Sequence, residues 1–152
     1  MGTLREEISF IDDYLAIELV RFGDKLRFEK DIDNRALDML VPTMILQPIV
    51  ENSIKHGLAN KIEGGTISLR VWLDGPRLCI MIGDDGLGIP ESKLATLFER
   101  GIGVSNVEER LRVLFGNAYQ IRVDSELGAG TRTVIEIPEM PVATAAEVAG
   151  VR

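Results

Sequence analysis

Four polar side chains in the segment VPTMILQPIVENSIKHGLAN, residues 41–60, are spaced so that one face of a helix could gather them. They are Glu51, Asn52, Lys55 and His56, at i, i+3 and i+4 spacing. Together these groups could meet a magnesium-bound phosphate chain, because Mg²⁺ keeps several waters and takes few protein oxygens. A solvated polar helix face is the alternative interpretation of the same pattern.

Three glycine-rich stretches are the second candidate for chemistry: DDGLG at 84–88, GIGVSN at 101–106 and GAGT at 128–131. None of them is a P-loop, because the pattern G-x-x-x-x-G-K-[ST] is absent. GIGVSN is not a dinucleotide-binding fingerprint, since Asn106 stands in place of the third glycine. DDGLG lacks the later ligands of a calcium loop. Each stretch alone is typical of a turn, so their order along the chain carries the information.

The composition is that of one soluble globular domain, with 152 residues of which 45% are hydrophobic and 27% charged. The net charge of −7 argues against nucleic-acid binding, which needs a basic surface. No apolar stretch approaches the ~20 residues of a membrane span, and no signal peptide opens the sequence, so we expect a cytoplasmic domain. The single cysteine, Cys79, excludes an internal disulfide, and a single histidine leaves no zinc cluster.

Hydrophobic periodicity predicts an α+β fold in which helices cover one face of a mostly antiparallel sheet. Helices are predicted at 4–22, within 43–60, at 91–100 and at 104–116, and strands at 25–33, 66–73, 77–85, 119–126 and 131–139. The first helix has a coiled-coil-like apolar stripe, so it could pack on a partner or on its own domain. Thr43 is the predicted cap of the second helix, and Pro48 marks a kink or its first turn.

The order of the motifs resembles that of a known superfamily. ENSIKHG, DDGLG, GIGVSN and GAGT are similar to the N, G1, G2 and G3 boxes of the Bergerat-fold ATPases, which include gyrase, heat-shock chaperones, mismatch-repair ATPases and histidine kinases. Within it, YLAIELVRFGDKL, PTMILQPIVENSIKHG and GVSNVEERL resemble LytS-type sensor histidine kinases. The resemblance covers about residues 4 to 138. It implies a two-layer α/β sandwich whose mixed sheet is covered on one face by helices, with an ATP lid.

The resemblance also assigns residues to a Mg-ATP site. Asp84 corresponds to the carboxylate that accepts a hydrogen bond from the adenine amino group, and Asn52 to the magnesium ligand. The remaining binding residues it implies are Lys55, His56, Gly86, Gly88, Gly101, Gly103, Val104 and Thr131. Glu51 and Lys55 would be catalytic: the first would accept the imidazole proton or orient the acceptor, and the second would neutralise phosphate charge. Asp85 is expected to face solvent, and Arg110 to be a surface arginine rather than a phosphate ligand.

The phosphoacceptor motif of the family is a histidine followed by phenylalanine and asparagine on an upstream helix, and it does not occur in this sequence. We therefore expect a fragment: residues 1–22 end a dimerisation or linker helix, 23–139 form the ATP-binding domain, and 140–152 are a disordered tail. The implied partners are ATP, the phosphoacceptor helix of the same full-length protein, a response regulator and a second copy joined through upstream helices. The parent protein could lie in the bacterial inner membrane.

Two other classes of function remain open on the sequence. In an ATPase clamp like gyrase or the chaperones, Glu51 would instead activate water, but the chain ends soon after the last predicted strand, without a transducer domain. An ATP-sensing interaction module, or a serine kinase like the anti-sigma factors, is the third class. The helix at 4–22 and the stretch YLAIELVRF favour the sensor kinase.

Overall fold

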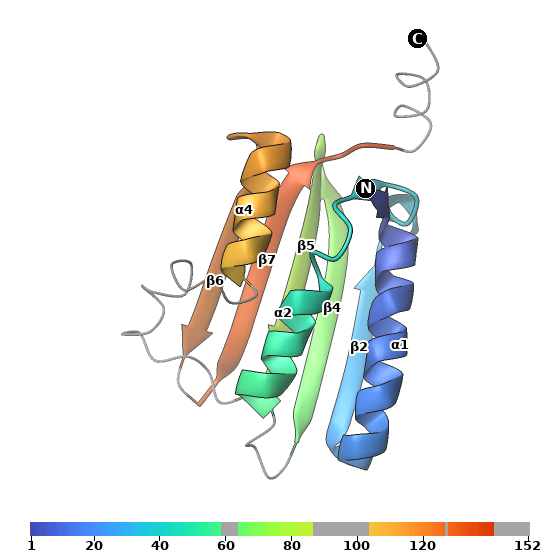
Figure 1. Cartoon of the computed structure of the whole chain (residues 1–152), viewed down its shortest axis with the longest axis vertical. Coiled ribbons are helices and arrows are strands. Elements are labelled where there is room, and N and C mark those ends of the chain that lie inside the picture. The colour runs from blue at the N-terminus through green and yellow to red at the C-terminus, as the bar shows by residue number, and fades with distance from the viewer. Residues whose placement is uncertain (59–63, 87–103, 127, 142–152) are drawn as a thin grey trace.

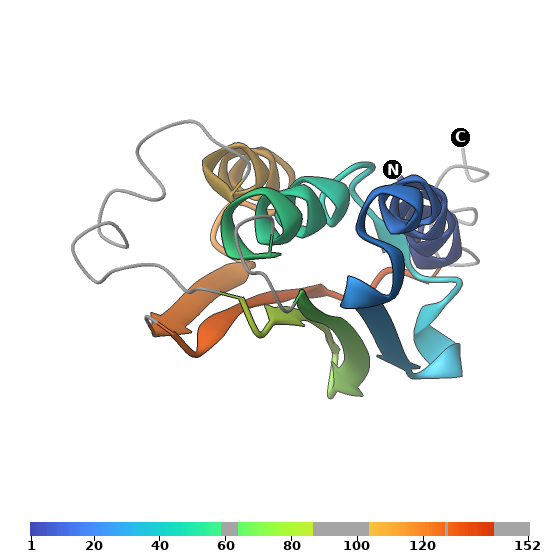
Figure 2. The same cartoon turned by 90° about the horizontal axis from the view of Figure 1, so that it is seen from below.

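The computed structural model of the chain describes residues 1–58, 64–86, 104–126 and 128–141. Within these ranges the elements form two layers, a five-stranded sheet and a set of helices that lie along one of its faces (Figures 1 and 2). The predicted two-layer α+β fold is confirmed.

The first helix, α1, spans Leu4–Phe22, as the periodicity predicts. A capping box begins it, because the Thr3 side chain accepts from the Glu6 amide while the Glu6 carboxylate accepts from the Thr3 amide. Its predicted seam residues Leu4, Ile8, Ile11 and Leu15 are buried in the same core as the sheet. Helix α1 therefore packs on its own domain, and residues 1–22 share one core with the rest. Its role as the end of a dimerisation segment stays a prediction.

The sheet has the strand order β2-β4-β5-β7-β6. Its strands are β2 Leu26–Ile32, β4 Gly65–Asp74, β5 Arg77–Asp84, β6 Gln120–Glu126 and β7 Gly130–Pro138. Only β2 pairs in parallel, with β4, because helix α2 crosses between them along the chain. The predicted strands at 66–73 and 77–85 form an antiparallel hairpin, β4 and β5, joined by the turn at Gly75 and Pro76. A second, two-stranded sheet pairs β1 Gly2–Thr3 with β3 Leu40–Val41.

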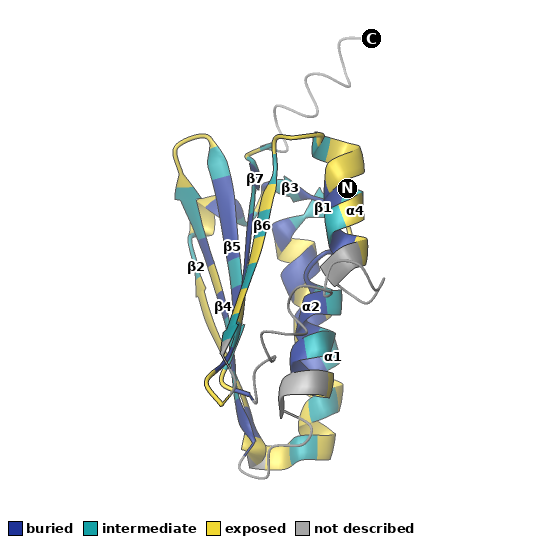
Figure 3. Cartoon of the chain, turned by 90° about the vertical axis from the view of Figure 1, so that its left-hand side faces the viewer, coloured by how far each residue is buried: buried dark blue, intermediate teal, exposed yellow. Residues whose placement is uncertain are grey.

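Alternate residues of the central strands face the helices and form the core (Figure 3). On β5 these are Leu78, Ile80 and Ile82, each at most 2% exposed. Helix α4, Val104–Phe115, contributes Val107 and Leu111 and ends at Gly116, whose amide donates to the Arg112 carbonyl. Cys79 of β5 is also buried.

The second helix, α2, spans Gln47–Asn52 and continues as a π-helix over Ser53–Leu58. Leu46, Val50 and Ile54, spaced four residues apart, are buried and form the apolar side of this helix. Pro48 lies in the first turn, where its missing N–H costs no helical hydrogen bond. The predicted Thr43 cap is wrong: the N-cap position falls on Leu46, and no side chain at that position caps the helix.

Gly130 packs closely against the end of β5. It has φ +101°, and a Cβ there would lie 2.0 Å from the Asp84 carbonyl oxygen. We predict that Gly130→Ala lowers the free energy of unfolding by roughly 3 kcal/mol or more, because it adds a backbone clash to the strain of a positive φ. The matched control is Gly128→Ala, with φ +86° and nothing within 4 Å of the added Cβ, which should cost about 1–2 kcal/mol. Urea unfolding in which both variants lose the same stability would contradict the close approach.

Candidate functional site

Asp84 is the last residue of the central strand β5, at the end of the buried series Leu78, Ile80 and Ile82. Its register partners are Ile67 on β4 and Thr131 on β7. Because side chains alternate along a strand, Asp84 shares the face of the sheet that carries the helices. A carboxylate thus stands where the apolar core ends beneath α2.

Three protein donors contact the Asp84 carboxylate. The Gly86 amide donates to its Oδ1 over 2.9 Å, and the Ser53 hydroxyl and the Thr131 amide also donate to it. Burial raises the pKa of the Asp84 carboxyl; the donors from Gly86, Ser53 and Thr131 oppose this rise, whereas the charge of Asp85 adds to it. The carboxylate is therefore held in one place but is not fully compensated by its neighbours.

Asp85 is exposed, as predicted, and it has a structural role as well. Its Oδ1 accepts from the Thr66 amide over 2.8 Å, and its own amide donates to the Thr66 carbonyl over 3.3 Å. These bonds join the chain beyond β5 to the start of β4. The two adjacent carboxylates consequently do different things: Asp85 holds the strand end while Asp84 points toward the helix layer.

Thr131 lies beside Asp84 at the start of β7, as its register requires. Its hydroxyl lies 2.8 Å from the hydroxyl of Ser125 on β6, and the Ser125 hydroxyl donates to the Gly130 carbonyl over 2.9 Å. The G1-like and G3-like stretches, far apart in the sequence, therefore meet at one end of the sheet. Gly86, which donates to Asp84, is buried at the same end.

Helix α2 passes over this end of the sheet and carries the predicted polar group. Glu51 and Asn52 are half-buried, and Lys55 is exposed. The Glu51 Oε1 accepts from Gln47 Nε2 over 3.1 Å. The wider π-helical turn begins at Ser53, so Lys55 and His56 do not follow Glu51 and Asn52 at the angle of a regular α-helix. The His56 side chain lies outside the described residues.

Tyr14 and Glu18 of α1 lie close to each other, and the charge of Glu51 on α2 also acts on Tyr14. Burial raises the pKa of Tyr14 to about 12, with further contributions from the charges of Glu18 and Glu51 and from a hydrogen bond to Glu18. The Glu18 side chain is 14% exposed and lies 3.8 Å from the Arg21 guanidinium. Helix α1 thus adds a phenol and a carboxylate to the acidic side of α2.

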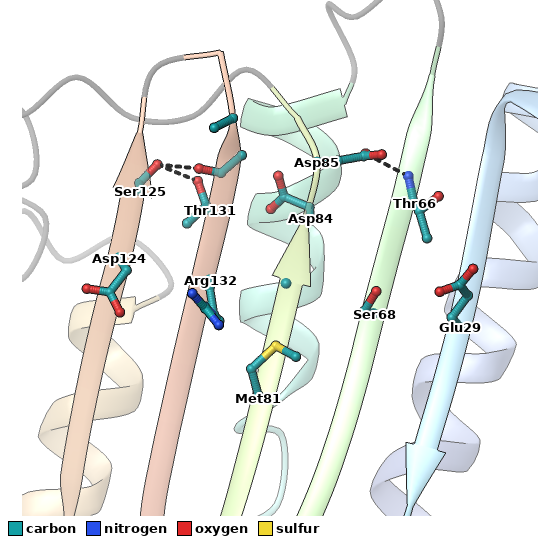
Figure 4. Close-up of a pocket in the computed structure, with 13 residues that line it drawn as sticks. Glu29, Thr66, Ser68, Met81, Asp84, Asp85, Asp124, Ser125, Thr131 and Arg132 are labelled. Carbon is teal, nitrogen blue, oxygen red and sulfur yellow. Dashed lines mark hydrogen bonds between the residues drawn. The ribbon is translucent and has the colours of Figure 1, made fainter.

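A cavity of about 600 Å³ lies at the same end of the sheet but on the face away from the helices (Figure 4). Ser68, Met81 and Arg132 point into it, all from positions that alternate with the core residues of β4, β5 and β7. Asp84 and Thr131 line its edge, whereas Asn52 and Lys55 do not line it. The cavity therefore borders the sheet end at which the sequence predicts a nucleotide, on the side away from α2.

Several predicted site residues cannot be placed together with these. Gly88, Gly101 and Gly103, and the helix predicted at 91–100, lie outside the described residues. Val104 begins helix α4, although its side chain is not described. Of the predicted group, the structure thus brings Asp84, Gly86 and Thr131 together below α2, with Asn52 on the helix.

Sequence reasoning missed Ser53, Tyr14 and Gly130. Ser53 is 8% exposed between the buried Val50 and Ile54, so a hydroxyl on the apolar side of the helix was the available signal. Tyr14 carried no local signal, because its partner Glu51 is remote in sequence. No cluster of three or more His, Cys, Asp or Glu side chains that could hold a metal occurs in the described part of the chain.

The protein family described as "Histidine kinase-, DNA gyrase B-, and HSP90-like ATPase" matches residues 38–141. The sensor histidine kinase YesM of Bacillus subtilis (strain 168) is 35% identical over 136 residues, which are 90% of this chain and 24% of that protein. The sensor protein LytS of the same organism is 29% identical over 143 residues, 89% of this chain and 24% of that protein. The chain therefore spans about a quarter of the length of these relatives.

A solved structure shows the same fold. The histidine kinase domain of the Erythrobacter litoralis EL346 blue-light activated histidine kinase superposes with a TM-score of 0.69 at 22% identity. The match covers 97% of this chain and 65% of that one. The predicted family resemblance and the predicted sandwich fold are both confirmed.

Proposed function

We propose a function from one established premise: the chain belongs to the histidine kinase-, DNA gyrase B- and HSP90-like ATPase family, and its relatives and fold are those of the catalytic domains of sensor histidine kinases. Its function is to bind Mg-ATP and to present the γ-phosphate to a histidine on an upstream helix of the full-length protein. The observation that carries this proposal is the half-buried Asp84 carboxylate, held at the sheet end below α2.

In this proposal the Asp84 carboxylate accepts a hydrogen bond from the adenine amino group. An ionised carboxylate offers about four acceptor positions. The Gly86 amide uses one of them, Ser53 and Thr131 also stabilise the carboxylate, and a donor from a ligand would bind to a remaining position. A base with a carbonyl at that place would leave two acceptors facing each other, so the carboxylate selects adenine. Gly86 and Thr131 lie at the same end. Gly86 and Gly88 would permit a close approach of backbone to nucleotide, because they carry no Cβ.

The phosphates lie toward the C-terminal part of α2. Asn52 offers one amide oxygen, which suits Mg²⁺ because that ion takes few protein ligands and completes its shell with phosphate oxygens and water. The lack of a carboxylate cluster among the described residues agrees with such a sparse protein contribution. When bound, the ion neutralises phosphate charge. Lys55 and His56 contact the phosphate chain, and the amides of Gly101, Gly103 and Val104 receive its oxygens.

Catalysis by this domain consists mainly of positioning and charge neutralisation. Lys55 is exposed and free to reach a phosphate oxygen. Glu51 accepts the proton of the incoming imidazole or orients it; its Oε1 is held by Gln47. Burial raises the pKa of Tyr14 of α1 and the charge of Glu51 adds to this rise, so a phenol is close to that half-buried carboxylate.

The partners of the whole protein follow from the same proposal. They are a response regulator, which takes the phosphate from the histidine, and a second copy joined through the upstream dimerisation segment that residues 1–22 would end. In this proposal the parent protein lies in the bacterial inner membrane, with this domain in the cytoplasm. Within this chain, no helix of the described ranges is long and apolar enough to cross a bilayer.

Asn52→Ala should weaken ATP binding by roughly tenfold or more in magnesium and leave it little changed in EDTA, because the amide oxygen acts through the ion. Titration calorimetry in the two buffers measures both affinities. Gln47→Ala is the control on the same helix, since Gln47 contacts Glu51 and not the ion. Equal losses for Asn52→Ala in both buffers would mean that Asn52 supports the fold instead.

Phosphotransfer itself is tested with γ-labelled ATP. The 152-residue chain should bind ATP without labelling itself, because the acceptor helix is absent and a histidine beside the phosphates cannot reach the in-line position. A longer protein that includes the upstream acceptor helix should gain acid-labile, base-stable label. Label of that kind on the 152-residue chain, lost in His56→Gln, would make His56 the acceptor and overturn the assignment. Steady ATP hydrolysis without transfer would favour the clamp ATPase.

A further inference from the structure

The turn at 43–46, which leads into α2, has an unusual backbone. Met44 has φ +64° and is the only residue other than glycine with a positive φ among the described residues. Such a conformation costs on the order of 1–3 kcal/mol and persists only where surrounding contacts enforce it. Ile45 and Leu46 in the same turn are fully buried, so the turn is anchored on the core.

A buried carboxylate from α1 holds this turn on one side. Glu7 is 2% exposed, and its Oε2 and Oε1 accept from the amides of Met44 and Leu46 over 2.9 and 3.0 Å. Leu46 is the N-cap residue of α2, where amides have no helical partner. Glu7 therefore caps the start of α2, which the predicted cap residue Thr43 does not do. Glu7 lies 39 residues before Leu46 in the sequence. Its negative charge also suits the start of a helix.

A guanidinium from α4 holds the same turn on the other side. Arg110 donates through Nη1 to the Met44 carbonyl over 2.9 Å and through Nη2 to the Thr43 carbonyl. The amide of Met44 is thus bound to Glu7 while its carbonyl is bound to Arg110. Side chains of helices α1 and α4 thus both bind this turn, and the half-buried Arg110 is hydrogen-bonded there rather than free in solvent.

From this geometry we propose that Glu7 and Arg110 are positioning residues for the nucleotide site, acting through the turn at 43–46. The hydrogen bonds of Glu7 and Arg110 to the turn at 43–46 form a clamp that holds the start of α2. The bond from Ser53 to Asp84 holds the part beyond Asn52. Between these two points Asn52 has its place fixed relative to Asp84. The inference rests on the proposed function, since it concerns how Asn52 is presented to the magnesium ion of Mg-ATP.

The test is the magnesium advantage, defined as the ratio of the ATP dissociation constant in EDTA to that in magnesium, measured by calorimetry. Arg110→Ala should reduce this ratio by roughly tenfold, the scale of one lost charge-assisted hydrogen bond. The double variant Asn52→Ala/Arg110→Ala should show no further reduction beyond Asn52→Ala, because Arg110 acts through Asn52. A generally weakened fold would not produce this non-additivity.

Arg112→Ala is the matched control, because Arg112 lies on the same helix, is exposed and pairs with Glu108. It should leave the magnesium advantage unchanged. Arg110→Lys keeps the charge but loses one of the two hydrogen bonds to the turn, and Glu7→Gln keeps the shape but loses the charge. Both variants should have a magnesium advantage between those of the wild type and Arg110→Ala. These milder variants, with circular dichroism melts, replace Arg110→Ala if it does not fold.

The outcomes separate the clamp from the function. Wild-type protein that binds no ATP overturns the proposed function, and the inference falls with it. Wild-type protein that shows a magnesium advantage, with Arg110→Ala and Arg110→Lys showing the same advantage, overturns the clamp alone. Additive losses in the double variant would also overturn it, because Arg110 would then act independently of Asn52.

Discussion

The hydrogen-bonded carboxylate of Asp84 is the contact on which the proposed site depends. It ends the central strand of the sheet, and its donors come from three separate segments: Ser53 of the helix layer, Gly86 just beyond β5, and Thr131 of β7. A partly buried charge is costly unless such donors compensate it. The segments that supply them must therefore stay in register, and the close approach of Gly130 to the Asp84 carbonyl is part of that register.

The helix layer meets the same requirement by a different route. Helix α2 is short and has no side-chain cap of its own, so α1 and α4 hold its start through Glu7 and Arg110. Its continuation as a π-helix directs Ser53 to Asp84. Backbone irregularity is thus found at both ends of α2, and the proposed ligand residues lie at its C-terminal end. π-helical turns are frequent at functional sites.

The sequence predicts the elements well and their mutual contacts poorly. The bounds of α1 and the five strands of the main sheet follow from local periodicity, and the four boxes indicate the family from their order. The cap on α2 could not be predicted, because Thr43 is a good local candidate whereas the true acceptor, Glu7, lies 37 residues before Met44. The same holds for Arg110, which looks like a surface residue until the turn it contacts is known.

The central claim is that Asp84 recognises adenine through its amino group, and one comparison tests it most directly. Calorimetric titration of the wild-type chain with Mg-ATP and with Mg-inosine triphosphate, which differ at the position of the amino group, measures the discrimination. The account predicts that the inosine nucleotide binds at least roughly tenfold more weakly, and that Asp84→Asn reduces this difference by weakening ATP binding. Equal affinity of the wild-type chain for both nucleotides would contradict it.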